Sequence, residues 1–177
     1  MRRLRLGAAA VSALLIWSAG ACKRRPPQVE TVEDENQPAL SVVPVAHPRA
    51  APQLLNGFHQ VEENSWRWTM GRFAVAVQPP PGSSERGARL ELRFSLPDSV
   101  VSRRGPVTLS AWVEGTALPP QTYAQAGEHT YARDVPPEAL RLAPARVSFA
   151  LDKFLRAGEI EARELGLVVT SVGLAPK

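Results

Sequence analysis

Hydrophobic and polar residues alternate along most of the chain beyond residue 56, which is the period of a strand with one buried face. The clearest runs are 89–96 and 107–113, and 146–152 repeats the pattern. In 72–77, apolar residues occupy both faces, as in a strand covered on both sides. In the last run, 166–174, the alternation predicts one face with Leu167, Val169, Ser171 and Gly173 and the other with Val168, Val172 and Leu174.

Turn-forming residues separate these runs at short intervals. Pro-rich or Gly-containing clusters lie at 79–84, 97–98, 104–106, 114–115, 119–120, 136–137 and 157–158. A single helical turn is expected from Pro137 to Leu140, because proline suits the first turn of a helix. Several short strands with such punctuation are typical of an antiparallel sandwich. The predicted fold class is therefore all-β, an antiparallel, jelly-roll-like β-sandwich over residues 56–177.

The first 21 residues have a different pattern, without alternation. Arg2, Arg3 and Arg5 precede an apolar run that ends in small residues before Cys22. This is the order of a secretory signal peptide with a helical apolar region. The apolar run is shorter than the ~20 residues that cross a bilayer, so an uncleaved membrane helix is the second interpretation. Residues 1–21 are expected to be a signal peptide.

Cys22 is the only cysteine of the chain, and its place resembles bacterial lipoprotein signals, in which small residues precede a cysteine that becomes diacylated. The resemblance implies lipidation of Cys22 and a stable membrane anchor. Ala19 stands where that family usually has a larger aliphatic residue, so ordinary cleavage after Ala21 stays open. Because position 23 is not Asp, resemblance to enterobacterial sorting signals implies the outer membrane, with the protein facing the periplasm or the exterior.

Residues 22–55 have no sustained apolar period. The segment is rich in proline and carries an acidic cluster at 30–35. Such a composition cannot bury enough apolar surface to offset the entropy of ordering the chain. It predicts a disordered, Pro-rich tether between the signal peptide and the sandwich domain.

The positive charge of the chain lies outside the predicted domain. The net charge is +4, and +3 of it belongs to residues 1–55, which leaves +1 for residues 56–177. A nearly neutral domain without a basic run argues against nucleic acid as a partner. The domain also lacks cysteine, so it is expected to fold without a disulfide.

Spaced motifs in the domain resemble a β-sandwich module of exported proteins from soil bacteria and, more loosely, accessory domains of bacterial glycosyltransferases. The motifs that carry the resemblance are Gly57–Glu62, Trp66–Thr69, Phe94–Pro97, Val107–Ser110 with Gly115, Tyr131–Pro136, Ala150–Lys153 and Arg163–Gly166. The resemblance implies a carbohydrate-associated or interaction module and no particular reaction.

Trp66, Arg67 and Trp68 are the leading candidates for a ligand site. On a strand the two tryptophans share one face, and Arg67 points to the other. Two exposed tryptophans would form a platform for sugar rings. The more common outcome for tryptophan is burial, so the core is the favoured interpretation and the platform the alternative. Arg163 is the fourth candidate, either paired with Glu62, Glu161 or Asp152 or free to bind a carboxylate or sugar hydroxyls.

The sequence offers no catalytic constellation. His59 and His129 lack metal-ligand spacing, and neither a G-x-S-x-G motif nor a Gly-rich phosphate loop occurs. No cofactor or metal is expected, and the protein is expected not to be an enzyme. The sequence predicts a lipid-anchored cell-envelope protein that binds a glycan or an envelope partner. A structural subunit of an envelope complex is the alternative, and a small periplasmic hydrolase is a more distant one.

Overall fold

A computed structural model describes residues 38–177. The predicted signal peptide, Cys22 and the first part of the predicted tether lie outside the described residues. Within 38–177, no helix is long and apolar enough to cross a membrane. The strands of this part are β1 (Val42–Pro44), β2 (Leu54–Glu62), β3 (Trp66–Val77), β4 (Ala88–Leu96), β5 (Val107–Val113), β6 (Thr116–Tyr123), β7 (Gly127–Val135), β8 (Ala145–Leu151) and β9 (Val168–Pro176).

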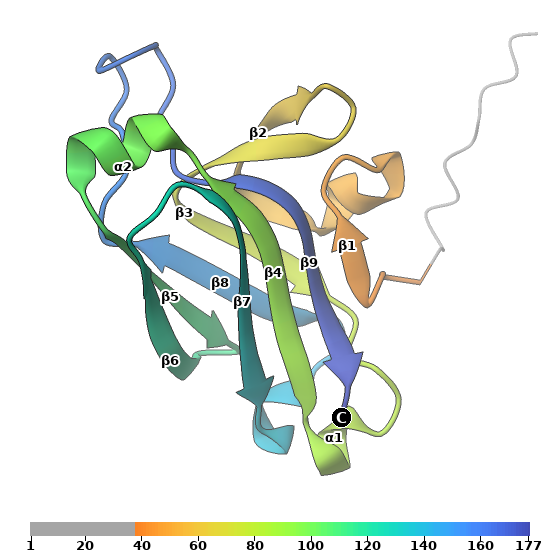
Figure 1. The fold of residues 1–177 in the computed structure, drawn as a ribbon. Coiled ribbons are helices and arrows are strands. Elements are labelled where there is room, and N and C mark those ends of the chain that lie inside the picture. The colour runs from red at the N-terminus through yellow and green to blue at the C-terminus, as the bar shows by residue number, and fades with distance from the viewer. Residues whose placement is uncertain (1–37) are drawn as a thin grey trace, which may run out of the picture. The chain divides into compact units, whose positions relative to one another are not determined.

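All strand pairs are antiparallel, which confirms the predicted all-β, sandwich-like fold. The strand order is β6-β5-β8-β3-β9-β4-β7, with β1 added to β9 and β2 to β3. β3 belongs to both layers, because its residues 72–77 pair with β8 whereas Arg67 and Trp68 pair with β9. Figure 1 shows β4, β7 and β9 side by side in one layer, with β5, β6 and β8 in the other.

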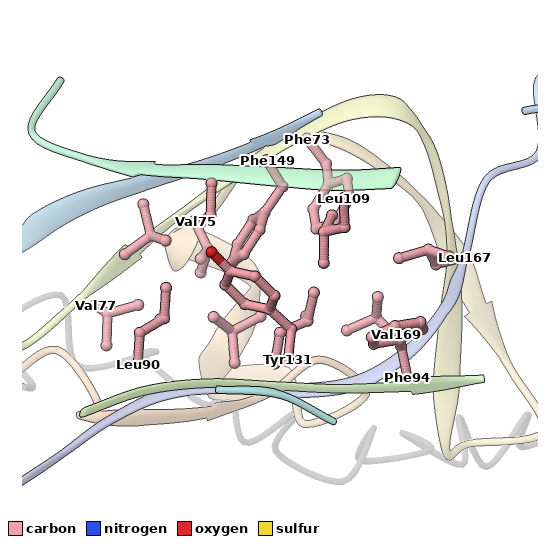
Figure 2. Close-up of a cluster of buried hydrophobic side chains, with 14 of the residues drawn as sticks. Phe73, Val75, Val77, Leu90, Phe94, Leu109, Tyr131, Phe149, Leu167 and Val169 are labelled. Carbon is pink, nitrogen blue, oxygen red and sulfur yellow. The ribbon is translucent and has the colours of Figure 1, made fainter. Parts of the chain in front are cut away.

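The core lies between the two layers, and the alternating runs supply it from both sides. Phe73 of β3 stacks on Phe149 of β8 with ring centroids 4.8 Å apart. Figure 2 shows these rings facing Tyr131, Leu90 and Val169 of the opposite layer. The inward positions predicted from alternation are confirmed as buried: Leu90, Leu92, Phe94, Leu96, Val107, Leu109, Ala111, Val113, Val147, Phe149 and Leu151.

The faces predicted for the last strand are wrong beyond its middle. Arg93 of β4 is opposite Ser171, and the next residue, Phe94, is opposite Val169, so Thr170 of β9 is an extra residue. This β-bulge reverses the alternation of the following side chains. Leu167, Val169, Val172 and Leu174 are all buried as a result, and Ser171 and Gly173 move to the outer face.

The structure also corrects the turn predicted at Pro119 and Pro120. Both prolines lie inside β6, where one extra residue bulges between the pairs Leu109–Gln121 and Ala111–Leu118. Proline is tolerated there because β6 is at the end of the strand order, where no further ladder needs its N–H.

Side chains of β7 join β6 to β7 across these prolines. The Tyr131 hydroxyl donates to the Pro119 carbonyl (2.9 Å), as does Nε of Arg133 (2.9 Å). The Arg133 guanidinium also lies 4.8 Å from the centroid of the Tyr131 ring. The two end strands of the sheet therefore meet through side chains, and we call this contact the β6–β7 seam.

The two tyrosines of the chain, Tyr123 and Tyr131, lie beside the seam and provide a spectroscopic test. Burial raises the pKa of Tyr123 from 10.0 to about 12 and also raises the pKa of Tyr131. We expect the folded protein to form no tyrosinate near pH 10, as measured by ultraviolet absorbance. Because the folded state retains these protons more tightly than the unfolded chain, the associated stability is complete below pH 10 and is lost as the pH rises towards 12. Tyrosinate formation near pH 10 with native circular dichroism would contradict the burial.

The folded part begins upstream of the boundary predicted at residue 56. The segment 38–55 contains β1 and a 3₁₀ helix, η1 (Pro48–Gln53), and it buries Val43, Val45 and Ala50. The predicted tether is therefore wrong for this segment. The apolar residues of this segment follow no sustained period and so gave no strand signal. β1 has only three residues, and its burial comes from pairing with the distant β9.

Gln53 attaches this segment to the sheet. Its side chain is only 6% exposed. Its Oε1 accepts from the Leu40 N–H (2.8 Å), and its Nε2 donates to the carbonyls of Leu40 (3.0 Å) and Ala76 (2.7 Å). The buried amide therefore completes the hydrogen bonding of a segment that has little regular structure of its own.

Two α-helices, α1 (Ser83–Arg86) and α2 (Asp98–Arg104), occupy connections that the sequence presented as turns. The helical turn expected at Pro137–Leu140 is confirmed as the 3₁₀ helix η2.

Candidate functional site

Trp66 and Trp68 share one face of β3, as the strand period predicts. Their ring centroids are 6.2 Å apart with an interplanar angle of 79°, an edge-to-face arrangement. Trp68 is paired with Val168 of β9, and it packs against the hydrophobic core. Both tryptophans are half-buried. The pair is thus neither a fully buried core element nor an open two-ring platform.

Trp66 lines an open groove on the outer face of β3, β9, β4 and β7. The groove has a volume of about 690 Å³, and its other lining residues include Arg93, Ser95, Glu128, Thr130 and Thr170. These side chains point outward from neighbouring strands because they lie on the opposite parity from the buried core residues. We refer to this depression as the Trp66 groove. It combines the rings of Trp66, Phe94 and His129 with hydroxyl, carboxylate and guanidinium groups.

Arg67 holds the backbone together and does not line the groove. Its Nε donates to the Val45 carbonyl (2.7 Å), and its Nη1 donates to the His59 carbonyl (2.9 Å). These two bonds connect β3 to the segment after β1 and to β2. The guanidinium is thereby occupied with main-chain acceptors.

Arg163 forms the structural ion pairs that were the first of its two interpretations. Its Nη1 lies 2.7 Å from Glu62, and its Nε donates to Glu161. The hydrogen bonds that Arg163 donates to Glu161 and, with a smaller effect, to Glu62 raise the pKa of Arg163 above its ordinary value, and the bond to Glu161 lowers the pKa of Glu161. Glu62 is directly opposite Trp66 in the β2–β3 ladder, so Arg163 connects the loop before β9 to the hairpin that carries Trp66.

Arg93 is the arginine that the structure brings to Trp66, and the sequence analysis missed it. Its side chain is 66% exposed, and its nearest carboxylate, that of Glu91, is 3.7 Å away. The strand parity of 89–96 already placed Arg93 on the outer face. What the sequence did not provide was the pairing of β4 with β9, which brings that face beside Trp66.

The three histidines among residues 38–177 do not form a catalytic group. Nδ1 of His47 accepts from the Arg49 N–H (3.1 Å) at the start of η1. Nε2 of His59 donates to the Glu164 carbonyl (2.6 Å), and Nε2 of His129 donates to the Gln125 carbonyl (2.8 Å). Both partners are main-chain groups, so neither imidazole is aligned by a carboxylate or positioned against a serine hydroxyl. Among residues 38–177, no cluster of His, Cys, Asp and Glu has the arrangement of a metal site.

No known protein-family model matches this chain, and a comparison with curated proteins finds no significant match.

Proposed function

We propose that this chain is a non-catalytic, lipid-anchored protein of the cell envelope that binds a glycan in the Trp66 groove. The observation that carries the proposal is the half-buried indole of Trp66 in a groove lined by hydroxyl and charged groups. A sugar ring presents an apolar C–H face and a rim of hydroxyls. An indole suits the first, and Arg93, Ser95, Thr130 and Thr170 suit the second.

The proposed anchor limits how far the groove can be from a membrane. Acylation of Cys22 would leave residues 23–37 between the anchor and the described domain. Even fully extended, a chain of that length spans only about 50 Å. The proposed ligand is therefore a polymer close to the membrane surface. The intact mass of the membrane-extracted protein tests the anchor, because acyl chains on Cys22 add a defined mass.

The alternative, a structural subunit that docks through an apolar surface, has weaker support. Among residues 38–177, the large exposed apolar side chains come from three different strands and two loops: Val42, Leu55, Met70, Leu142 and Ile160. Scattered residues of this kind are usual on soluble proteins. The Trp66 groove supplies the more specific surface.

Replacing Trp66 by alanine is expected to weaken glycan binding by at least about tenfold, or about 1.4 kcal/mol. Trp112→Ala is the matched control, because Trp112 is a half-buried residue of β5 outside the groove. The measurement is the affinity of the full-length protein for ligands selected on a glycan array, with the melting temperature of each variant determined in parallel.

Two results would count against the site. The array could return no ligand at all, or Trp66→Ala and Trp112→Ala could lower the affinity equally. If the Trp66→Ala variant unfolds, Trp66 stabilises the hydrophobic core and its role in glycan binding is contradicted.

A further inference from the structure

The outer face of β9 has a second depression that continues the Trp66 groove. It has a volume of about 240 Å³ and is lined by Val42, Glu91, Arg93, Ser171, Gly173 and Ala175. Arg93 lines both depressions, and its backbone is opposite Ser171 of β9. The two hollows are therefore consecutive along one strand and meet at one guanidinium.

The β-bulge at Thr170 creates this continuity. It turns Ser171, Gly173 and Ala175 outward, so the outer row of β9 has short side chains where it runs between β1 and β4. Neighbouring strands are about 4.8 Å apart, and the longer side chains of Val42, Glu91 and Arg93 on the flanking strands form the walls. A Cβ atom on Gly173 would lie 3.0 Å from Cγ2 of Val42. The Val42 side chain of β1 therefore lies close to the backbone of β9 at Gly173.

The combined groove is long. From Val168, opposite Trp68, to Ala175 it runs along the stretch of β4 from Ser95 to Arg89. Because Thr170 is a bulge residue, this is six residue steps, or about 20 Å at the rise of an antiparallel strand. That length accommodates several linked sugar rings. Trp66 alone would contact one of them. Figure 1 shows β9 running beside β4 over this length, with β1 on its other side.

The charges along the groove are mixed. Glu91 and Glu128 contribute two negative charges. Arg93 contributes one positive charge, and Arg89, which is opposite Ala175 and 3.8 Å from Glu91, contributes a second. The Arg93 guanidinium stays largely in solvent because its contact with Glu91 is long (3.7 Å). Since the charges balance, a polymer with repeating carboxylates would gain no net attraction and would be repelled at Glu91 and Glu128, whereas a neutral polymer would find donors and acceptors without repulsion.

We infer that the ligand is an uncharged, linear oligosaccharide that lies along β9, with one ring against Trp66 and the next rings over Arg93 towards Ala175. This inference rests on the proposed glycan-binding function and adds the length, direction and charge of the ligand. Arg93, at the junction of the two depressions, donates hydrogen bonds to hydroxyls of adjacent rings.

The test is a length series on the full-length protein, with neutral oligosaccharides from cellobiose to cellohexaose and oligogalacturonates of matching length as probes. Tryptophan fluorescence or calorimetry gives the affinities. We expect cellohexaose to bind at least about tenfold more tightly than cellobiose, and each oligogalacturonate to bind more weakly than the neutral probe of equal length. Ala175→Ile should reduce the affinity for cellohexaose to that for cellobiose, because it fills only the second depression. Ala150→Ile is the matched control, because Ala150 is a half-buried residue of β8 in the other layer.

The possible failures are distinct. Equal affinities for short and long probes would overturn the extended ligand but leave a one-ring site at Trp66. Preference for the oligogalacturonates would overturn the neutral ligand. Absence of binding by any probe, together with an empty glycan array, would overturn the proposed function itself. Ala175→Ile without effect on cellohexaose, in a protein that melts like wild type, would remove the second depression from the site.

Discussion

Replacing Gly57 by alanine is expected to lower the free energy of unfolding by about 3 kcal/mol. Gly57 has a φ of +74°, and a Cβ atom there would lie 2.1 Å from the Arg72 carbonyl oxygen and 2.7 Å from the Phe73 Cα. Both neighbours are backbone atoms of β3, which pairs with β8 at these residues. The overlap can be relieved only if β2 moves away from β3. Urea denaturation measures the change.

Gly115→Ala separates the two causes of this loss. Gly115 also has a positive φ, +83°, but a Cβ atom there meets nothing within 4 Å. Its replacement should therefore cost only the positive-φ backbone term of about 1 kcal/mol. If the two variants are destabilised equally, the close approach of β2 to β3 at Gly57 does not exist.

Replacing Gln53 by alanine is the second change with a large expected effect, about 2–3 kcal/mol. The variant removes three hydrogen bonds and leaves the Leu40 N–H without this partner, as it does the Ala76 carbonyl, whereas the Leu40 carbonyl keeps its bond from the Gln78 N–H. The variant should lower the stability of the whole domain and also loosen the segment before β1, because these hydrogen bonds attach that segment to the sheet. Hydrogen exchange should show faster exchange at Leu40 and Gln78, whose backbone groups pair with each other.

Gln60→Ala is the control for this experiment, since Gln60 is an exposed residue of β2. It should change stability by less than about 0.5 kcal/mol. A Gln53→Ala variant with wild-type stability and unchanged exchange at Leu40 would show that the folded domain does not depend on the segment 38–47.

Alternation was sufficient to predict the inner faces of strands that contain no bulge themselves. β4, β5 and β8 each bury every second side chain, so the period alone identified their inner faces. The same logic failed in β9, because a bulge adds a residue whose effect on the faces depends on the partner strand. The run Val168-Val169-Thr170-Ser171 contains no residue that identifies the bulge.

The turns show the same limit. Pro119 and Pro120 have the local chemistry of a turn, and only their position on an end strand makes them compatible with β6. In α2, Val100 and Val101 are weak helix formers, so the local sequence does not predict a helix. The helix is closed by Gly105, which has a φ of +71° and whose N–H donates to the Val101 carbonyl (2.8 Å). Pro97 and Gly105 are the two ends of this one helix, whereas the sequence analysis interpreted them as two separate turns.

For the candidate site, the sequence provided the residues of one strand and missed their neighbours. The shared face of Trp66 and Trp68 follows from parity alone. Their different environments do not, because Trp68 is covered by the core and Trp66 by side chains from β4, β7 and β9. Arg67 and Arg163 attracted attention as free guanidinium groups, whereas tertiary pairing gives them internal partners and leaves Arg93 in the groove.

The β6–β7 seam has a consequence for the protein at high concentration. An open sheet edge recruits the edge of another molecule through unsatisfied N–H and carbonyl groups. At Pro119 and Pro120 the N–H donors are absent, and the carbonyls already accept from Tyr131 and Arg133. At these two residues β6 therefore offers no template for edge-to-edge growth, and copies at high concentration are protected there from aggregation.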